Sequence, residues 1–310
     1  MSLATTPEQA ALAASVRGVI DRHGEQAWPH LRTEIGVAGL LVPERFGGLG
    51  ASLADAAVVL EELGRELTPS AMLGTVVAVS ALLATGDEEA CARLLPAVAA
   101  GSSTLALVLP GAAFVLDGIA AETFLVADGG MLVEVAAADV VRAPVPGFDE
   151  SRSFASVRCD GVTGGCLGPF DQAAVEAVAC AALSAEQVGA AARALDRTVA
   201  YSLQRVQFGR PIGAFQALAH RMADLHVLVE SATSLAWAAV QEPADATLAA
   251  AAKVHCSEAF TTVAGEMIQL HGGIAITWEH DAHRYLRRAY TDARLFGDPD
   301  GHVARVWAAM

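Results

Sequence analysis

The stretch Arg205-Val-Gln-Phe-Gly-Arg-Pro-Ile212, closely followed by Phe215 and Gln216, separates two long segments with the apolar periodicity of helices. Its glycine and proline favour a turn, so the chain is expected to form a helix–turn–helix corner there. Guanidinium groups bind phosphate oxygens in bidentate fashion, and the N-terminus of the second helix adds its dipole and free N–H groups. The stretch therefore predicts a diphosphate-binding corner, whereas a lone arginine would indicate only an ordinary surface turn.

Apolar residues recur at intervals of three and four on both sides of this corner. The repeats are Val188, Ala192, Leu195, Val199, Leu203 and Val206; then Phe215, Leu218, Met222, Leu225, Val229 and Ala232; and later Ala252, Cys256, Ala259, Val263, Met267 and Leu270. Glu242-Pro243 separates the second run from the third, and a fourth helix is expected from about Asp281 to Phe296. These segments predict a C-terminal four-helix bundle domain over residues 169–310.

Helical signals also dominate the N-terminal third of the chain. Thr6 precedes Pro7 at the start of one apolar-periodic run, and Ser52 precedes another from Leu53 to Gly64. Both are capping patterns, and the glycines between residues 43 and 50 predict a loop between helices. We therefore expect an N-terminal helical domain over residues 1–102.

Between residues 103 and 168 the pattern changes to short apolar runs bounded by turn residues. The expected strands cover residues 104–109, 113–117, 123–126, 131–135 and 153–157. Asp128-Gly129-Gly130 between two of them predicts a hairpin. The fold class is therefore α+β and mainly α, with a small middle β domain.

Composition excludes several classes of protein. The chain has 310 residues, a net charge of −15 and 54% apolar residues. The negative charge argues against nucleic acid or an anionic membrane as a partner. No run reaches the roughly 18–20 uninterrupted apolar residues of a membrane span, the nearest candidate being residues 72–84. Alanine-rich helices instead suggest burial on several sides, as in a homo- or hetero-oligomer.

The cysteines and the N-terminus point to the cytoplasm. There are five cysteines, an odd number, and none forms a Cys-x-x-Cys pair. Free thiols in a reducing compartment are therefore expected rather than disulfides or a zinc site. Residues 1–8 show no charged-then-apolar signal for export.

Two motifs resemble the acyl-CoA dehydrogenase family. One is the corner from Arg205 to Gln216 with Ala223-Asp224, and the other is Gln-Leu-His-Gly-Gly-Ile-Ala-Ile-Thr-Trp-Glu over residues 269–279, with Arg287-Arg288-Ala289 downstream. The resemblance runs nearly end to end and implies the same helical, β and helical order. It also implies α,β-dehydrogenation of an acyl-CoA thioester with FAD, and an electron-acceptor flavoprotein as a partner.

The resemblance assigns cofactor-binding roles to residues of both motifs. Arg205 would hold the FAD pyrophosphate, Phe208 would lie against the adenine, and Gln216 would support the same region. Gln269, Gly272 and Gly273 would lie along the diphosphate and ribose, where glycine permits close approach. In this family such groups largely serve the flavin of a neighbouring subunit.

The sequence departs from the family in the flavin-ring region and at the catalytic base. No Thr-Glu-Pro or Gly-Ser-Asp stretch occurs between Ser103 and Gly168, and this region is dozens of residues shorter than usual. Phe296 stands where the family carries its glutamate, and a second known location falls near Ala179 and Cys180. Glu186 lies seven residues further on, and a polar helix contact is favoured over a role as base. The catalytic base is therefore unassigned.

Such a short, degenerate chain resembles the partner subunits of actinobacterial heteromeric acyl-CoA dehydrogenases. Their association with steroid side chains or rings favours a bulky acyl-CoA substrate. A full-length partner would supply the flavin-ring site and the base. Two alternatives stay open, namely a flavin-dependent oxidase or monooxygenase of the same fold, and a non-catalytic structural or regulatory subunit.

A metal site is not expected. Glu279 and His283 have the spacing of a metal-binding pair on a helix, and His271 and His280 lie nearby in sequence. No third ligand is evident, so structural or capping roles are favoured for these residues.

Overall fold

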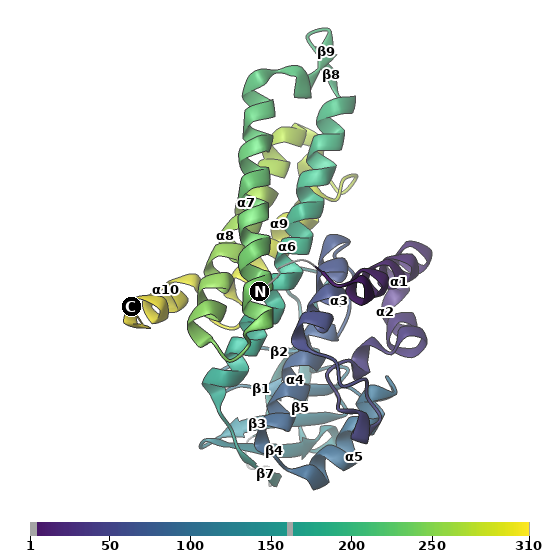
Figure 1. Ribbon diagram of the computed structural model, residues 1–310, viewed down its shortest axis with the longest axis vertical. Coiled ribbons are helices and arrows are strands. Elements are labelled where there is room, and N and C mark those ends of the chain that lie inside the picture. The colour runs from purple at the N-terminus through teal and green to yellow at the C-terminus, as the bar shows by residue number, and fades with distance from the viewer. Residues whose placement is uncertain (1–4, 160–163, 310) are drawn as a thin grey trace.

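A computed structural model describes residues 5–159 and 164–309 of the chain. Helices at both ends of the sequence flank a middle region of strands, and a tall helical bundle rises from the rest of the molecule (Figure 1). This arrangement confirms the predicted fold class, α+β and mainly α.

The N-terminal region is helical as predicted. Its helices are α1 (Pro7–His23), α2 (Ala27–His30), α3 (Leu53–Arg65), α4 (Met72–Thr85) and α5 (Glu88–Ala99). Thr6 and Ser52 form capping boxes at the starts of α1 and α3, which confirms both capping predictions. Between α2 and α3 the chain makes only short turns of helix, including one at Glu44–Phe46 inside the predicted glycine loop.

The strands of the middle region form two small sheets. Their bounds are β1 (Leu105–Val108), β2 (Val115–Leu116), β3 (Thr123–Asp128), β4 (Met131–Ala136), β5 (Val141–Val145), β6 (Phe154–Arg158) and β7 (Gly165–Pro169). One sheet has the order β1-β3-β4-β7 and the other β2-β6-β5. Strands β3 and β4 pair in antiparallel fashion across Asp128-Gly129-Gly130-Met131, so the predicted hairpin is confirmed.

The sequence did not predict β5 and β7. Strand β5 contains Pro144, which suggested a turn, but β5 lies at the edge of its sheet, where proline is tolerated. Strand β7 has glycines at two of its five positions and pairs with β4 through an irregular register. Both strands depend on a neighbouring strand rather than on their own apolar pattern.

The C-terminal region contains the predicted four-helix bundle. Its helices are α6 (Gln172–Gln204), α7 (Gln216–Gln241), α8 (Ala246–His271) and α9 (Ala282–Arg294). Helix α9 ends before Phe296, which has a positive φ of 60°. A further helix, α10 (Pro299–Ala309), was not predicted; it extends away from the bundle toward the C-terminus (Figure 1).

Helix α6 is long and apolar enough to cross a membrane by length and composition alone. However, 78% of its most apolar 18-residue window is buried inside the molecule. It is therefore the central helix of the fold, and it contacts α3, α7, α8 and α9.

The hydrophobic core crosses the expected domain boundaries. One cluster joins residues of α1, α3 and α4 to α6, and another joins α4, α5 and the larger sheet to α6. The chain thus changes from helix to strand near residue 102, and back near residue 168, without a break in the hydrophobic core. The division into three domains at these positions stays a prediction.

Helices α3 and α6 touch through their backbones. A Cβ atom on Gly64 would lie 2.1 Å from the carbonyl oxygen of Glu186, and one on Gly189 would lie 2.1 Å from the carbonyl oxygen of Glu61. Both distances are far below any real carbon–oxygen contact. Only glycine at both positions allows this close crossing.

A buried ion cluster lies beside the crossing. The Arg288 side chain is 1% exposed and donates hydrogen bonds to Asp149, to Glu186 at 2.6 Å and to Ser151 at 2.7 Å. Arg152 donates to Asp292 at 2.8 Å and to Glu186 at 2.9 Å. The cluster ties the loop before β6 to α6 and α9, because its charges are paired and hydrogen-bonded across three segments.

Asp117, directly after β2, lies close to this cluster. It is 4% exposed, and its Oδ2 atom has no hydrogen-bond partner within the described part of the chain. Burial raises the pKa of Asp117 to about 7, although the positive charge of Arg152 opposes this effect. The carboxyl group is therefore held largely protonated at mildly acidic pH.

Gly189→Ala tests the helix crossing. The added methyl group must push the α3 backbone away, so we expect a loss of roughly 1–3 kcal/mol in the free energy of unfolding. Urea denaturation measures it. Gly265→Ala on α8 is the matched control, since a Cβ there meets nothing within 4 Å and should be neutral or slightly stabilising. Equal effects of the two substitutions would contradict the crossing argument.

Asp117→Asn tests the buried carboxyl group. Its pKa is 3.8 in an ordinary environment and about 7 in the folded chain. The protonated Asp117 carboxyl group therefore stabilises the folded chain. This contribution is fully present below the ordinary pKa of 3.8 and is lost as pH rises through the folded-state pKa of about 7. The Asp117→Asn variant has no group that titrates at this position. From pH 5 to pH 8 its free energy of unfolding should therefore rise by roughly 2–3 kcal/mol relative to that of the parent chain. Urea denaturation of both chains at the two pH values checks this, and a constant difference would refute it.

Candidate functional site

The corner between α6 and α7 is a small hairpin at the tip of the bundle (Figure 1). Val206–Gln207 (β8) pairs with Arg210–Pro211 (β9), and Phe208 and Gly209 between them have φ values of 53° and 79°. The N–H of Ile212 donates to the carbonyl of Arg205 at 2.8 Å. The predicted break is thus an ordered hairpin, whose strands were not predicted.

The side chains of the hairpin form an exposed aromatic and cationic group. Phe208 is 91% exposed and meets Phe215 edge-on, with ring centroids 6.1 Å apart. The guanidinium of Arg210 lies 4.1 Å from the centre of the Phe215 ring. Neither Arg205 nor Arg210 forms an ion pair with any residue described here. Two cations and an aromatic surface are therefore available to a ligand or to another chain.

The predicted Gln216 is the first residue of α7 and is exposed beside this group. The α7 N-terminus offers its dipole and backbone N–H groups there. Phosphate oxygens are the ligands that such a helix start and free guanidinium groups prefer. The geometry therefore fits the diphosphate-binding role that the sequence suggested for the corner.

The second motif lies at the end of α8. Gln269 is exposed on the last turn, and α8 ends at Gly272, whose φ of 66° favours glycine. Gly273 follows in a short 3₁₀ turn over Gly272–Ile276 and is also exposed. The motif thus presents an amide side chain and a glycine backbone to the outside of the bundle.

Tyr201 connects the two motifs. It lies one turn before Arg205 on α6, stacks on the His271 ring at 4.2 Å, and donates a hydrogen bond from its hydroxyl group to the His271 carbonyl at 3.3 Å. The structure thus brings the ends of α6 and α8 together, although no direct contact joins Arg205 to Gln269. Tyr201 was missed by the sequence analysis, which looked only at the motifs themselves.

The histidines near the second motif are occupied by local contacts. His271 Nδ1 pairs with the Met267 carbonyl at 2.8 Å, and His280 Nδ1 accepts from the Ala282 N–H at 3.1 Å. The His283 ring packs edge-on against Trp278. These contacts support the structural roles favoured from the sequence.

A cleft of about 660 Å³ lies between the strand region and the C-terminal helices. Loops after β1 and β5 form one wall, and α9, α10 and the start of α6 form the other. Its lining is mainly apolar and includes Leu109, Pro110, Phe114, Gly147, Phe148, Thr291, Arg294, Leu295 and Phe296. An apolar cleft with a few polar groups is the usual form of a small-molecule site.

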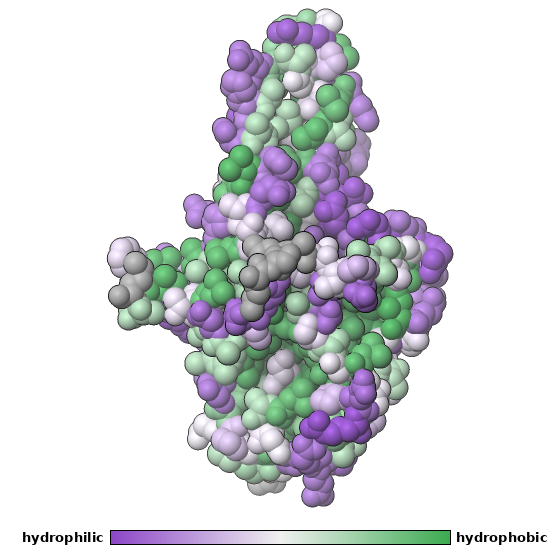
Figure 2. Space-filling view, in the orientation of Figure 1, coloured by the Kyte–Doolittle hydropathy of each residue, from purple (hydrophilic) through white to green (hydrophobic). Residues whose placement is uncertain are grey.

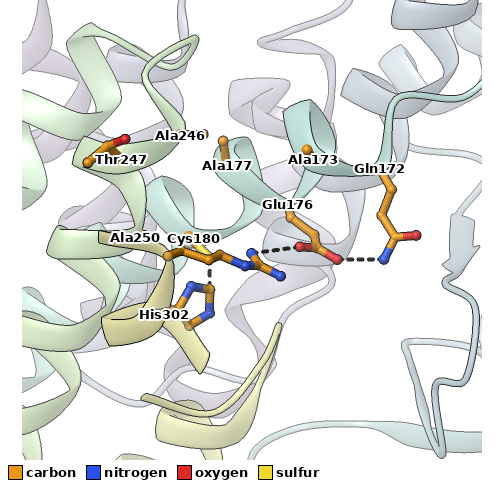
Figure 3. Close-up of a pocket in the computed structure, with 10 residues that line it drawn as sticks. Gln172, Ala173, Glu176, Ala177, Cys180, Ala246, Thr247, Ala250 and His302 are labelled. Atoms are coloured by element: carbon orange, nitrogen blue, oxygen red, sulfur yellow. Dashed lines mark hydrogen bonds and ion pairs between the residues drawn. The ribbon is translucent and has the colours of Figure 1, made fainter. Parts of the chain in front are cut away.

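The cleft is lined by Phe296, the residue that the sequence resemblance aligns with the family's catalytic carboxylate. The Phe296 carbonyl accepts a hydrogen bond from His302 Nε2 at 2.9 Å, which fixes the turn between α9 and α10. Among the residues that line the cleft in the described chain, Glu176 is the only carboxylate. It pairs with Arg305 at 2.9 Å and accepts from Gln172 at 2.6 Å (Figure 3).

Glu176 was not considered in the sequence analysis. It lies one turn before Ala179 on α6, so the spacing to the second known base position could have indicated it. Its ion pair with Arg305 and its hydrogen bond to Gln172 make it part of the cleft wall.

A second cavity of about 460 Å³ shares this wall. Cys180 and His302 line it, with Sγ and Nε2 3.9 Å apart (Figure 3). Burial raises the pKa of Cys180 to about 12, so the thiol stays protonated and is a poor nucleophile. Neither Ala179 nor Cys180 supplies a base, as the sequence indicated.

Glu186 is unsuited to the role of base. Its carboxylate is nearly fully buried and is held by two guanidinium groups, those of Arg152 and Arg288. Taking a proton there would leave two buried cations poorly compensated. The alternative favoured from the sequence, a polar contact between helices, describes Glu186 correctly.

Comparisons with known proteins point to the same family as the two sequence motifs. Residues 6–102 match the family described as acyl-CoA dehydrogenase, N-terminal domain, and residues 175–308 match acyl-CoA dehydrogenase, C-terminal domain. The chain is 42% identical to acyl-CoA dehydrogenase IpdE2 of Mycolicibacterium smegmatis, over 100% of this chain and 96% of that protein. It is 44% identical to IpdE2 of Mycobacterium tuberculosis, over 93% and 86% of the two chains.

Solved structures show the same fold. A variant of the Tcur3481-Tcur3483 steroid ACAD matches with a TM-score of 0.87 and 27% identity, covering 97% of both chains. The ChsE4-ChsE5 complex from Mycobacterium tuberculosis matches with a TM-score of 0.87 and 24% identity, covering 99% of this chain and 98% of that one. On the matched residues and the full-length identity, this chain belongs to the acyl-CoA dehydrogenase family.

Proposed function

We propose that this chain is a subunit of a heteromeric acyl-CoA dehydrogenase that removes the α and β hydrogens of a bulky acyl-CoA thioester. One observation carries the proposal: the cleft is lined by Phe296, which the resemblance aligns with the base, while the bundle end to which the resemblance assigns the cofactor is exposed. The similar structures named as a steroid ACAD and as the ChsE4-ChsE5 complex support both the bulky substrate and the mixed assembly.

In this assembly the bundle tip serves the flavin of the partner subunit. Arg205 would bind the pyrophosphate, Phe208 would cover the adenine, and Gln216 would hold the same region. Gln269, Gly272 and Gly273 would line the diphosphate and ribose. Support comes from the exposure of these groups and from the unpaired guanidiniums at the hairpin.

The surface of the bundle suits association with another chain. Apolar residues reach the surface of the bundle (Figure 2). Leu203 near the end of α6, Val206 in β8 and Val227 on α7 are each more than half exposed. Exposed apolar groups beside a polar rim are typical of protein interfaces. We therefore place a full-length acyl-CoA dehydrogenase subunit next to this end, in a dimer or a tetramer.

The partner supplies the flavin-ring contacts and the catalytic base. Bound FAD supplies hydride acceptance, and an electron-acceptor flavoprotein reoxidises it. This chain contributes binding and orientation at the bundle tip, because Glu176, which is ion-paired, is the only carboxylate among the described residues that line its own cleft. Free thiols at Cys91, Cys166, Cys180 and Cys256 suit the reducing cytoplasm.

Arg205→Ala tests the cofactor role. Loss of one charge-assisted contact to the diphosphate, worth roughly 1.5–3 kcal/mol, should weaken FAD retention by the purified complex about 10- to 100-fold. Flavin absorbance per complex after extensive dialysis measures retention. Arg45→Ala is the control, since Arg45 pairs with Glu88 in the N-terminal region. Unchanged retention in Arg205→Ala would contradict the assignment.

The isolated chain should show little or no dehydrogenase activity. General base catalysis contributes a factor of about 10²–10⁴, and Phe296 offers no such group. Activity should appear, together with stable flavin, on co-expression with the product of a neighbouring acyl-CoA dehydrogenase gene. An assay with bulky acyl-CoA esters, added FAD and an artificial electron acceptor checks both samples. Robust turnover by the isolated chain would refute the division of labour.

A further inference from the structure

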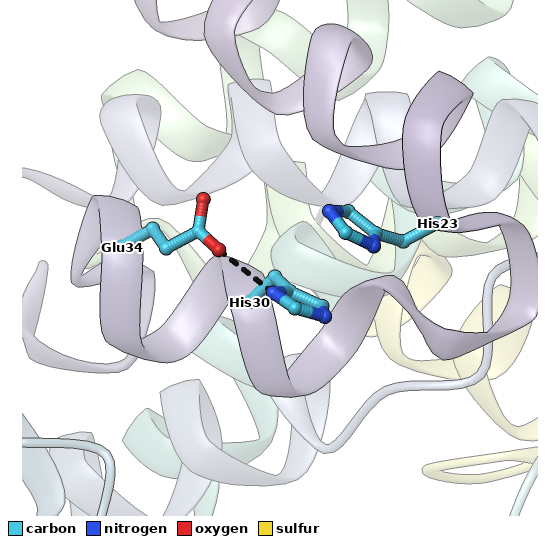
Figure 4. Close-up of side chains that lie close together, drawn as sticks. All are labelled: His23, His30 and Glu34. Carbon is cyan, nitrogen blue, oxygen red and sulfur yellow. Dashed lines mark hydrogen bonds and ion pairs between the residues drawn. The ribbon is translucent and has the colours of Figure 1, made fainter.

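Three potential metal ligands meet at the turn between α1 and α2, far along the chain from the proposed cofactor site. Helix α1 ends at His23, and Gly24, with a φ of 55°, lets the chain reverse into a short turn over Gly24–Gln26. Helix α2 then brings His30 back beside His23, and Glu34 follows one turn later (Figure 4).

The three side chains are close and already partly oriented. The rings of His23 and His30 stack with centroids 3.6 Å apart and an interplanar angle of 13°. His30 Nδ1 and Glu34 Oε1 are 2.7 Å apart. One ligand atom from each of the three residues lies within 4.8 Å of the other two.

These distances are near those of a metal centre. Zinc lies about 2.0–2.2 Å from imidazole nitrogen and carboxylate oxygen, so ligand atoms around it are roughly 3–3.5 Å apart. An ion can replace the proton shared by His30 and Glu34 with a small widening of their contact. Imidazole lone pairs lie in the ring plane, and the two ring planes are nearly parallel, so His23 must rotate to complete the site. No hydrogen bond to the described part of the chain opposes this rotation, and His23 is partly exposed.

We propose that His23, His30 and Glu34 form a binding site for a divalent transition-metal ion of the zinc class, with water completing the coordination. Imidazole suits zinc, copper and nickel, and a single carboxylate beside two imidazoles is a common three-ligand set. The site clips α1 to α2, independently of the dehydrogenase chemistry. The sequence analysis missed it because the three residues lie on separate short elements and only the last two share a helical spacing.

A substitution of Arg22 should change the affinity for the metal in the opposite direction to a substitution of a ligand. Its guanidinium lies 3.9 Å from the second carboxylate oxygen of Glu34. A positive charge at this distance disfavours a cation at the carboxylate. Removing Arg22 should therefore strengthen metal binding, whereas removing a ligand should weaken it.

The experiment is a calorimetric titration of the full-length, tag-free chain with Zn²⁺. We expect one ion per chain at this site, and His23→Ala, His30→Ala and Glu34→Gln should each weaken binding at least about tenfold. Arg22→Ala should bind more tightly than the parent chain. His255→Ala is the matched control, because its ring pairs with Ser231 elsewhere and its loss should change nothing.

A second readout separates the site from other zinc-binding groups. Saturating Zn²⁺ should raise the thermal midpoint of the parent chain and of His255→Ala but not of His30→Ala, because only a ligand bound to the folded site stabilises it. Circular dichroism without zinc establishes that each variant is folded. Absence of binding by the parent chain, or equal binding by the parent and all three ligand variants, would overturn the proposal.

Discussion

The close backbone crossing of α3 and α6 is the constraint on which the rest of the structure depends. Gly64 and Gly189 let each helix touch a carbonyl oxygen of the other, at Glu186 and Glu61. This contact fixes the part of α6 that carries Glu186, and Glu186 in turn accepts from two buried arginines. Those arginines hold the loop before β6, whose neighbouring residues line the cleft. The absence of a side chain at Gly64 and at Gly189 thus determines the position of one wall of the cleft.

Much of the fold was predictable because its signals are local. The capping boxes at Thr6 and Ser52, the hairpin at Asp128 and the periodicity of α6 to α8 each depend on residues close in sequence. The corner between α6 and α7 was equally accessible, since a glycine–arginine–proline break defines it within one short stretch, while its diphosphate-binding role stays a prediction. The edge strand β5 escaped prediction because its stability comes from β6 rather than from its own composition.

The remainder of the candidate site could not be predicted because it depends on contacts between distant residues. Arg288 and Glu186 are 102 positions apart, and Arg152 and Asp292 are 140 apart. No sequence pattern marks such pairs, so the sequence favoured a polar helix contact for Glu186 without indicating its partners. The structure shows that its surroundings carry two positive charges. Tyr201 was missed for the same reason, since its importance comes from what the fold places beside it, whereas the spacing of Glu176 to Ala179 could have indicated Glu176.

The distribution of charge supports the proposal that this end of the bundle binds an anionic group together with a second molecule. The chain has a net charge of −15, yet its buried arginines are matched by carboxylates, and most surface arginines also have acidic partners. Arg205 and Arg210 are exceptions, exposed beside the outward-facing Phe208 ring. Leaving cations unpaired in an acidic protein gives no stability to the chain itself. An anion held partly by another surface would account for this arrangement, which supports the proposal that the tip meets a neighbouring subunit.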